Sequence, residues 1–355
     1  MFDAVIVGGG PAGLAAALTL GRVHRQVLVI DAGQGRNAPA AQVHNFLTRD
    51  GTPPAELRAL AHAELAAYPT VRMVTGTVVR ALDGEGFRLE LSTGESVGAR
   101  RLVLATGLAD DLPGPRGVAE LWGRTAVHCP YCHGYECTGR RVAVLGAELS
   151  RVRLALQLSR FAADVVLCTD GHPLSADVRA ILETSGVGVR CEPVARLEGA
   201  DGLLEQVVFE SGPSLARDVV FVVNVPRQRS DLAARLGCAV FDDGCVEVDD
   251  LGRTSVRGVY AAGDMARRAG MPVPMAAVIA AAASGTIAAA ALDQDLLTTD
   301  HPLPSPSSHA PSSPDPLLQK TPPLPYSHTP ASPDPLLDGS RETSPLSSRE
   351  RGQGA

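Results

Sequence analysis

The chain has 355 residues, a formal net charge of −7 and a pI near 5.7. This acidic balance, without a basic stretch, argues against a general affinity for nucleic acid or an anionic membrane. Seven cysteines, scattered apart from one CxxC pair, argue against a secreted disulfide framework. The N-terminus enters an apolar strand with no charged leader, so we expect a cytoplasmic protein.

The first part of the chain alternates between strand and helix patterns. Residues 4–7 form an apolar run that predicts a buried strand, and a glycine turn and an apolar helix to about residue 24 follow it. Later segments continue this α/β pattern, with strands expected at 26–31 and 101–105, a helix at 53–67 and β structure at 71–91.

A dinucleotide-binding motif follows the first predicted strand. Gly8, Gly10 and Gly13 fit GxGxxG, in which the glycines allow a tight turn, close approach to a pyrophosphate and close packing of helix on strand. Asp31 ends the second strand, where a carboxylate can bind an adenosine ribose. Strand, helix and acid all fall where such a site needs them, whereas a glycine turn that binds nothing is the plainer alternative.

A second unit of the same kind begins at residues 141–146, with a helix at 149–160 and a strand at 164–167. A further strand at 257–261 runs into Gly263-Asp264, which precedes an Ala-rich helix over 275–292 that ends near residue 295. An aspartate there can bind a ribityl hydroxyl or cap the helix. The Ala-rich segment is long enough for a membrane span, but its alanine content favours a buried helix, and we expect no membrane contact.

Residues 298–355 have a different composition, dominated by Pro, Ser and Thr, and contain a duplicated segment at 308–318 and 327–337. Such a segment is too rich in proline for helix or central strand, so we predict a disordered low-complexity tail. A proline-rich ligand for a partner is the alternative.

Cys129-Pro130-Tyr131-Cys132-His133-Gly134 lies between the two nucleotide-binding patterns. Cysteines three positions apart can close a disulfide, and each thiol alters the acidity of the other. The same string occurs in c-type haem attachment, which would need an exported chain, and a structural zinc site would need two more ligands. We therefore expect a redox-active dithiol and no metal.

With these motifs the chain resembles the low-molecular-weight thioredoxin reductase-like flavoproteins, from residue 1 to about 297. Within that family, CPYCHG resembles the dithiol oxidases that close disulfides in gliotoxin- and holomycin-type metabolites. The resemblance implies an α/β fold of two Rossmann-like, three-layer domains. The FAD-binding domain would comprise residues 1–112 and 229–297, and a pyridine-nucleotide-type domain at 113–228, which carries the CxxC, would be inserted into it.

The resemblance also implies FAD-binding residues and roles for the dithiol. The family's FAD contacts fall on Gly8, Gly10, Gly13, Asp31, Asn45, Thr106, Gly107, Gly263, Asp264, Met275 and Ala276. Met275 stands where the family often has Gln, so that contact would need backbone N–H groups. Cys132 would be the charge-transfer thiolate against the flavin, and Cys129 the thiol that exchanges with substrate. His133 replaces an Asp of thioredoxin reductases and is the candidate base for an incoming dithiol, or a structural imidazole.

The second nucleotide motif departs from the pattern. It keeps Gly146, but Glu148 and Arg151 occupy the positions of the second and third small residues. A carboxylate about 5 Å from a pyrophosphate costs roughly 3 kcal/mol at an effective dielectric constant near 20. Asp170 would also disfavour a 2′-phosphate. We expect this domain to keep its fold but to bind NAD(P)H weakly or not at all.

These features predict an FAD-dependent thiol–disulfide oxidoreductase that oxidises a dithiol and passes electrons through Cys129 and Cys132 to FAD and then to O₂. The alternatives are an NAD(P)H- or ferredoxin-dependent reductase of thioredoxin or a similar disulfide, and a non-catalytic flavin-binding redox sensor. The expected partner is a small dithiol or a thioredoxin-like protein, and the resemblance implies a homodimer.

Overall fold

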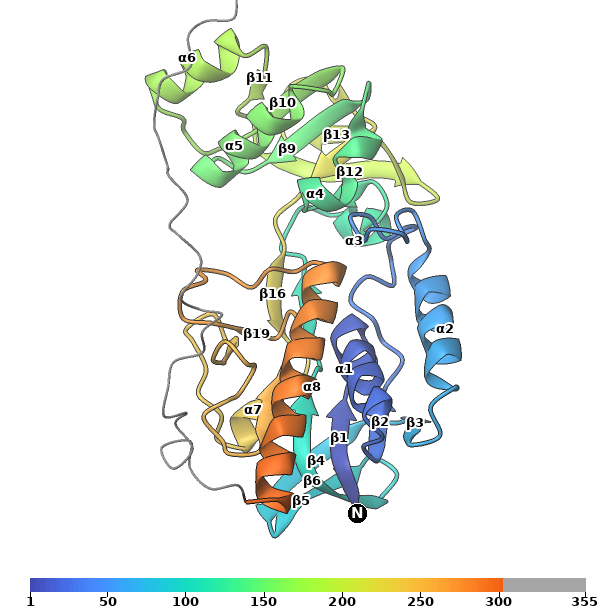
Figure 1. The fold of residues 1–355 in the computed structure, drawn as a ribbon. Coiled ribbons are helices and arrows are strands. Elements are labelled where there is room, and N and C mark those ends of the chain that lie inside the picture. The colour runs from blue at the N-terminus through green and yellow to red at the C-terminus, as the bar shows by residue number, and fades with distance from the viewer. Residues whose placement is uncertain (303–355) are drawn as a thin grey trace, which may run out of the picture. The chain divides into compact units, whose positions relative to one another are not determined.

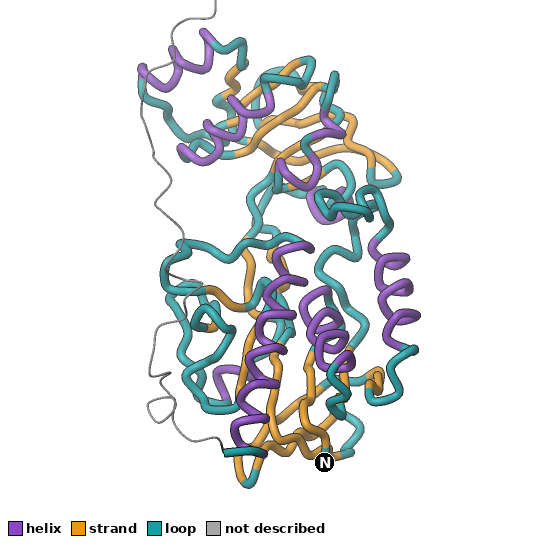
Figure 2. The backbone as a smooth tube through the Cα atoms, viewed as in Figure 1, coloured by secondary structure: helices purple, strands orange, loops and turns teal. Residues whose placement is uncertain are grey.

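A computed structural model describes one unit of the chain, residues 1–302 (Figure 1). Most of the tail predicted for residues 298–355 therefore lies outside the described residues. Helices and strands alternate through the described part, as Figure 2 shows, so the α/β character expected from the sequence is present. The division of this unit into an FAD domain and an inserted domain stays a proposal.

The larger sheet is mostly parallel. Within residues 1–302 its order is β3-β2-β1-β6-β5-β4, and β18 pairs with the second half of β6, on the same edge as β5. Strands β4 and β5 form an antiparallel extension, whereas β1, β2, β3, β6 and β18 run parallel. The strands are β1 (Phe2–Val7), β2 (Val27–Asp31), β3 (Val71–Thr75), β4 (Val78–Gly84), β5 (Gly86–Leu91), β6 (Ser96–Leu104) and β18 (Val259–Ala261).

The second sheet is parallel and has the order β11-β10-β9-β15-β8. Its strands are β8 (Ala126–Val127), β9 (Arg141–Leu145), β10 (Asp164–Cys168), β11 (Gly188–Arg190) and β15 (Val219–Phe221). An antiparallel sheet accompanies it, formed by β12 (Val194–Ala200), β13 (Leu203–Phe209) and β14 (Leu215–Ala216). The chain passes between the two large sheets along the antiparallel pair β7 (Leu108–Asp111) and β16 (Val225–Gln228).

The remaining elements are helices and one small parallel pair of strands, β17 (Val246–Glu247) and β19 (Ala266–Arg267). The helices are α1 (Pro11–Arg22), α2 (Pro54–Leu65), α3 (Val118–Leu121), α4 (Pro130–His133), α5 (Leu149–Leu158), α6 (Ala176–Thr184), α7 (Leu232–Arg235) and α8 (Val278–Asp300), with a 3₁₀ turn at Tyr135–Cys137.

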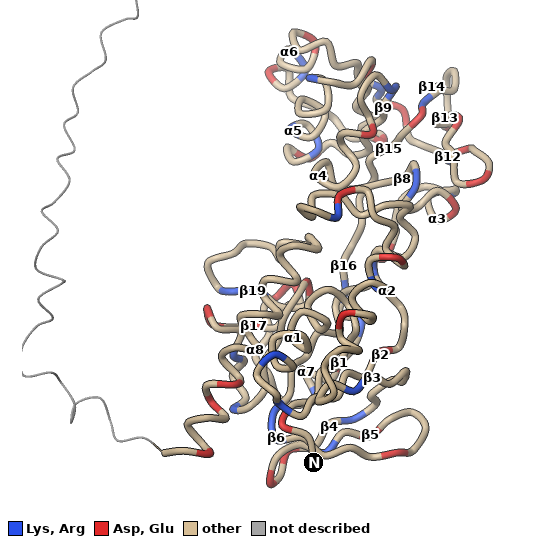
Figure 3. Tube along the Cα trace, turned by 45° about the vertical axis from the view of Figure 1, so that its right-hand side comes forward, with Lys and Arg blue, Asp and Glu red and all other residues tan. Residues whose placement is uncertain are grey.

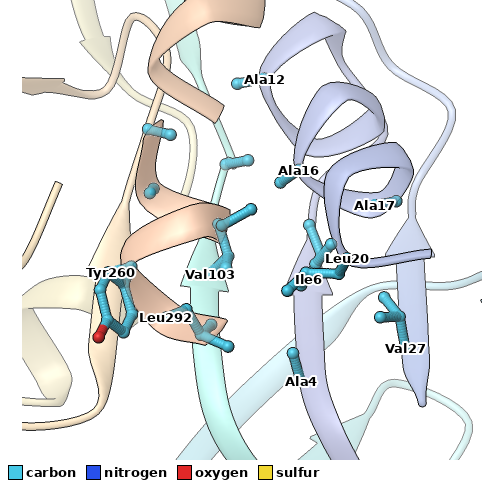
Figure 4. Close-up of a cluster of buried hydrophobic side chains, with 14 of the residues drawn as sticks. Ala4, Ile6, Ala12, Ala16, Ala17, Leu20, Val27, Val103, Tyr260 and Leu292 are labelled. Atoms are coloured by element: carbon cyan, nitrogen blue, oxygen red, sulfur yellow. The ribbon is translucent and has the colours of Figure 1, made fainter. Parts of the chain in front are cut away.

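Small residues let α1 and α8 pack closely on one face of the larger sheet. Ala12, Ala16 and Ala17 of α1 belong to the same buried cluster as Val103 of β6 and Leu292 of α8, and Figure 4 shows this cluster. On α8, a Cβ added at Gly285 would lie 2.0 Å from the backbone oxygen of Ala12. This close approach requires small side chains at the contact between the two helices. It agrees with the buried helix that the alanine content of this segment favoured. Among residues 1–302, no helix is long and apolar enough to cross a bilayer.

Helix α8 extends to Asp300, about five residues beyond its predicted end near residue 295. Ion pairs hold this last turn, because Asp293 and Asp300 accept hydrogen bonds from Arg25, and Asp300 also pairs with Arg100. Acidic and basic residues alternate along much of the described chain (Figure 3). The sequence pattern alone missed this extension, because the partners that hold it are distant in sequence.

Replacing Gly285 with Ala should destabilise the protein, although alanine normally favours a helix over glycine by about 1 kcal/mol. The new methyl group would overlap the Ala12 carbonyl, and overpacking typically costs about 1–3 kcal/mol. Thr286→Ala, at the next and exposed position, is the control and should not lower stability. Chemical denaturation of both variants measures the free energy of unfolding; a Gly285→Ala variant as stable as wild type would contradict the packing described.

Candidate active site

Strand ends bring residues from distant parts of the chain to one edge of the larger sheet. Gly8 follows β1, Asp31 ends β2, Thr106 lies two residues after β6, and Gly263 lies two residues after β18. Because these strands are parallel, their carboxyl ends meet at the same edge. Open α/β sheets bind their ligands at this edge, beside the point where strand order reverses.

The three motif glycines have different surroundings. A Cβ at Gly8 would lie 2.2 Å from the Ala105 oxygen, and one at Gly13 would lie 1.9 Å from the Gly8 oxygen. These positions therefore serve close packing of strand, turn and helix. A Cβ at Gly10 would meet no atom within 4 Å, because Gly10 faces open space at the N-terminus of α1. That space is where a pyrophosphate would approach the backbone.

A cavity of about 1420 Å³ lies at this edge. It is larger than the roughly 300–1,000 Å³ of an ordinary small-molecule pocket. Of the predicted site residues, all but Gly13 line it, namely Gly8, Gly10, Asp31, Asn45, Thr106, Gly107, Cys129, Cys132, His133, Gly263, Asp264, Met275 and Ala276. The structure thus places the dithiol and the predicted dinucleotide site in one cavity.

The residues at the cavity fit FAD on their chemistry. The open cradle at Gly10 faces the helix N-terminus, and Asp31 is held at the same turn because its carboxylate accepts a hydrogen bond from the Gly9 N–H, at 3.0 Å. Asp264 follows Gly263, which lies beside Ala12 of α1, and it is largely buried, which raises its pKa. A ribityl hydroxyl would supply such a buried carboxylate with a further hydrogen-bond donor.

The segment before α8 carries the predicted FAD contacts Met275 and Ala276. Met275 and Ala276 line the cavity, but the helix begins only at Val278. The Ala276 N–H donates to the Pro274 oxygen and the Ala277 N–H to the Met275 oxygen. The backbone N–H groups of Ala276 and Ala277 are therefore already engaged, and they are poor replacements for the glutamine side chain common in the family.

The dithiol lies directly after β8, the edge strand of the second sheet. Cys129 caps the short helix α4, and its backbone oxygen accepts from the N–H groups of Cys132 and His133. Hydrogen bonding with the Cys132 thiol lowers the pKa of Cys129 to about 7, against burial, and the charge of Arg36 acts in the same direction. The shared proton correspondingly raises the pKa of Cys132. The pair therefore loses its first proton easily and holds its second tightly.

His133 is available as a proton acceptor. Burial lowers its pKa, only partly offset by the charge of Glu136, so the imidazole is neutral near pH 7. Its Nδ1 is buried and has no hydrogen-bond partner among the described residues. Glu136 Oε1 lies 3.3 Å from His44 Nε2. This contact joins the 3₁₀ turn after the dithiol, Tyr135–Cys137, to the loop that carries Asn45.

Several residues at the cavity were not predicted from the sequence. Arg36 lines it and pairs with Asp110 and Asp264. His128 precedes the dithiol, stacks on Trp122 with ring centroids 5.4 Å apart, and has its pKa lowered to about 4, mainly by burial. The sequence signal for His128 was its position next to Cys129. Arg36 lies outside every motif in the sequence, so no spacing pointed to it.

The second nucleotide motif is covered by its own side chains. A Cβ at Gly146 would lie 2.6 Å from Glu148 Oε2 and 3.0 Å from Arg151 Cγ. Arg151 is only 9% exposed, and its Nε and Nη2 have no partner among the described residues. Asp170, at the end of β10, accepts a hydrogen bond from the Val194 N–H at 2.7 Å. Asp31 accepts a similar backbone hydrogen bond in the first motif, so the two motifs differ at Glu148 and Arg151 rather than at the acid that ends the second strand.

Comparison with known proteins identifies the family. The family described as pyridine nucleotide-disulphide oxidoreductase matches residues 2–284, and the chain belongs to it. A thioredoxin reductase, tcpT, of Claviceps purpurea is 35% identical over 74% of this chain and 86% of its own. A thioredoxin reductase, sirT, of Leptosphaeria maculans is 32% identical over 84% and 96%. The solved structure of an oxidoreductase from Agrobacterium tumefaciens has 36% identity and a TM-score of 0.77, over 83% of this chain and 98% of its own.

These matches confirm the predicted thioredoxin reductase-like family and its Rossmann-type fold. The protein is accordingly an FAD-dependent oxidoreductase that acts on thiol or disulfide groups. The side chains of Glu148 and Arg151 over Gly146 bear on whether the protein also binds NAD(P)H.

The Glu148→Gly variant should bind NADPH more tightly than the wild type. Removing the carboxylate relieves roughly 3 kcal/mol of repulsion, which corresponds to about a hundredfold in affinity. Titration of NADPH fluorescence measures the change. Glu183→Gln, on exposed α6, removes one negative charge elsewhere and should leave NADPH binding unchanged. Tight NADPH binding by the wild type would contradict the covered site.

Proposed function

We propose that this member of the pyridine nucleotide-disulphide oxidoreductase family works as a dithiol oxidase. A substrate dithiol would become a disulfide, and its two electrons would pass through Cys129 and Cys132. FAD, when bound, supplies the two-electron acceptor for the reduced cysteine pair and can return the electrons to O₂ as hydrogen peroxide.

One observation carries the proposal. Cys129 and Cys132 line the same cavity as Asp31, Thr106 and Asp264, although they follow a strand of a different sheet. The cavity also exceeds the usual volume of a single-ligand pocket, which leaves room for a small substrate beside a dinucleotide. A small dithiol is therefore favoured over a protein substrate.

The residues divide the work of the exchange step. A substrate thiolate attacks the Cys129 sulfur of the oxidised pair and forms a mixed disulfide, and Cys132 leaves as a thiolate. The second substrate thiol then attacks its own sulfur in the mixed disulfide, and Cys129 leaves. The low pKa of the first thiol supports this role, because a more acidic thiol is a better leaving group. His133, neutral and lining the cavity, would take up a substrate thiol proton.

Two alternatives make different use of the same cysteines. A reductase of thioredoxin or a similar disulfide would need an electron source, either NAD(P)H or ferredoxin. The side chains over Gly146 disfavour NAD(P)H, and a ferredoxin donor would be compatible with them. A flavin-binding redox sensor would need no turnover, but the acidic first thiol and the unpartnered His133 favour an enzyme. The homodimer and the cytoplasmic location stay part of the proposal.

Anaerobic mixing of the purified holoenzyme with dithiothreitol or with NADPH should separate these functions. We expect dithiothreitol to bleach the flavin and NADPH to bleach it far more slowly, because the second nucleotide site is covered. On admission of air, oxygen consumption should follow dithiol oxidation. Fast bleaching by NADPH would support the reductase, and no bleaching by either reagent would support the sensor.

His133→Gln should slow dithiol oxidation most at low pH. Near pH 7 the loss of a general base should cost about a hundredfold in rate. Near pH 9 the substrate thiol is itself largely ionised, so the rate should approach that of wild type. His172→Gln, an exposed histidine after β10, is the control and should follow the wild-type profile. An equal loss at both pH values would assign His133 a structural role.

A further inference from the structure

Arg36 connects two buried carboxylates through one guanidinium group. Its Nε and Nη2 donate to the two carboxylate oxygens of Asp110, at 2.8 and 2.6 Å, and its Nη1 donates to Asp264 Oδ2, at 2.9 Å. The side chains of Arg36, Asp110 and Asp264 have 18%, 6% and 19% of their surfaces exposed. A two-point contact of the kind made with Asp110 fixes the plane and the position of the guanidinium. The third donor is therefore held in one direction, toward Asp264.

Asp110 is itself held from a second side. It lies on β7, which pairs with β16 where the chain passes between the two large sheets. Its Oδ1 also accepts from Asn224 Nδ2, at 2.7 Å, and Asn224 comes directly before β16. Arg36 lines the cavity, but neither Asp110 nor Asn224 does. The anchor of the guanidinium thus belongs to the connection between the sheets and lies behind the cavity wall.

Asp264 has one carboxylate oxygen engaged by the protein and one free. Oδ2 accepts from Arg36, whereas Oδ1 accepts no hydrogen bond within residues 1–302 and keeps access to the cavity that Asp264 lines. A carboxylate held at one oxygen cannot turn freely about its side-chain bond. The remaining oxygen is therefore an acceptor of defined direction at the cavity wall, which suits a ligand hydroxyl group.

We propose that Arg36 is a positioning residue for FAD: anchored on Asp110, it holds the Asp264 carboxylate in the orientation in which Oδ1 accepts from a ribityl hydroxyl. Arg36 then acts on the cofactor through Asp264 and needs no contact with FAD itself. The inference rests on Asp264 as a predicted FAD contact. It holds for either direction of electron flow, because it concerns cofactor binding and not turnover.

FAD release from the purified holoenzyme tests this role. On dilution FAD dissociates, and the fluorescence of free flavin gives the dissociation constant. Arg36→Gln should weaken FAD binding about tenfold, the effect of losing one well-placed hydrogen bond to a charged acceptor. Asp264→Asn should weaken binding at least as much, because a neutral amide is a weaker acceptor than a carboxylate.

The double variant Arg36→Gln/Asp264→Asn separates positioning from other roles. If Arg36 acts through Asp264, its replacement has no further effect once the carboxylate is gone. The double variant should then bind FAD as tightly as Asp264→Asn alone. A merely structural Arg36, or one that contacts FAD directly, would weaken binding by the same factor in both backgrounds, and that result would overturn the proposal.

Arg36→Lys keeps the test decisive if Arg36→Gln does not fold. Lysine retains the positive charge but donates from a single nitrogen, so it cannot reproduce the three fixed hydrogen bonds of the guanidinium. We expect FAD binding weaker than that of wild type and stronger than that of Arg36→Gln. In the Asp264→Asn background the lysine should again have no effect.

Arg227→Gln is the matched control. Arg227 pairs with Asp111 across the same β7–β16 ribbon at 2.7 Å, but both side chains are more than half exposed and neither lines the cavity. This variant should bind FAD as tightly as wild type. The proposal also fails if the Arg36 variants release FAD no more readily than wild type, or if Arg227→Gln weakens binding as much as Arg36→Gln.

Discussion

A cysteine pair can pass electrons to a bound cofactor only if both occupy one cavity, and in this chain they depend on different sheets. The dithiol follows the short edge strand β8 of the second sheet, whereas the dinucleotide motif follows β1 of the first. The antiparallel pair β7–β16 joins the two parts, and Arg36 links it to Asp264. Close packing of α1 on α8 keeps the glycine turn and the Gly263-Asp264 turn at the same edge. The chemistry of the site rests on this shared cavity.

The two nucleotide motifs of the chain have different surroundings. At the first, Gly10 faces open space at the N-terminus of α1. At the second, Glu148 stands at the position of Gly10, and its carboxylate and Arg151 lie beside Gly146, the counterpart of Gly8. Under the proposed function, an enzyme with an open flavin site and side chains over its second nucleotide motif would take its electrons from a donor other than NAD(P)H. The dithiol in the cavity is the source that the proposal assigns.

The sequence patterns predicted the residues of the motifs, but not the side chains and hydrogen bonds around them. Gly8 and Asp264 could be predicted because each comes after an apolar strand, and Asp31 because it ends one, since parallel strands share their carboxyl edge. Thr106 was predicted from the family resemblance. Gly13 was assigned a packing role, which its contact with Gly8 bears out. Arg36, Asp110 and Asn224 lie 74 or more positions apart and follow no fixed spacing, so only the folded chain brings them together. The end of α8 and the backbone bonds at Ala276 and Ala277 likewise depend on tertiary contacts.

The central claim is that Cys132 lies between substrate and flavin in the path of the electrons. Single-turnover mixing of Cys132→Ser holoenzyme with excess dithiothreitol, followed by flavin absorbance in the absence of air, tests it most directly. The account predicts a yellow protein that binds FAD normally and whose flavin is bleached far more slowly than that of wild type. Bleaching at an undiminished rate, or a wild-type preparation without flavin colour, would contradict the account.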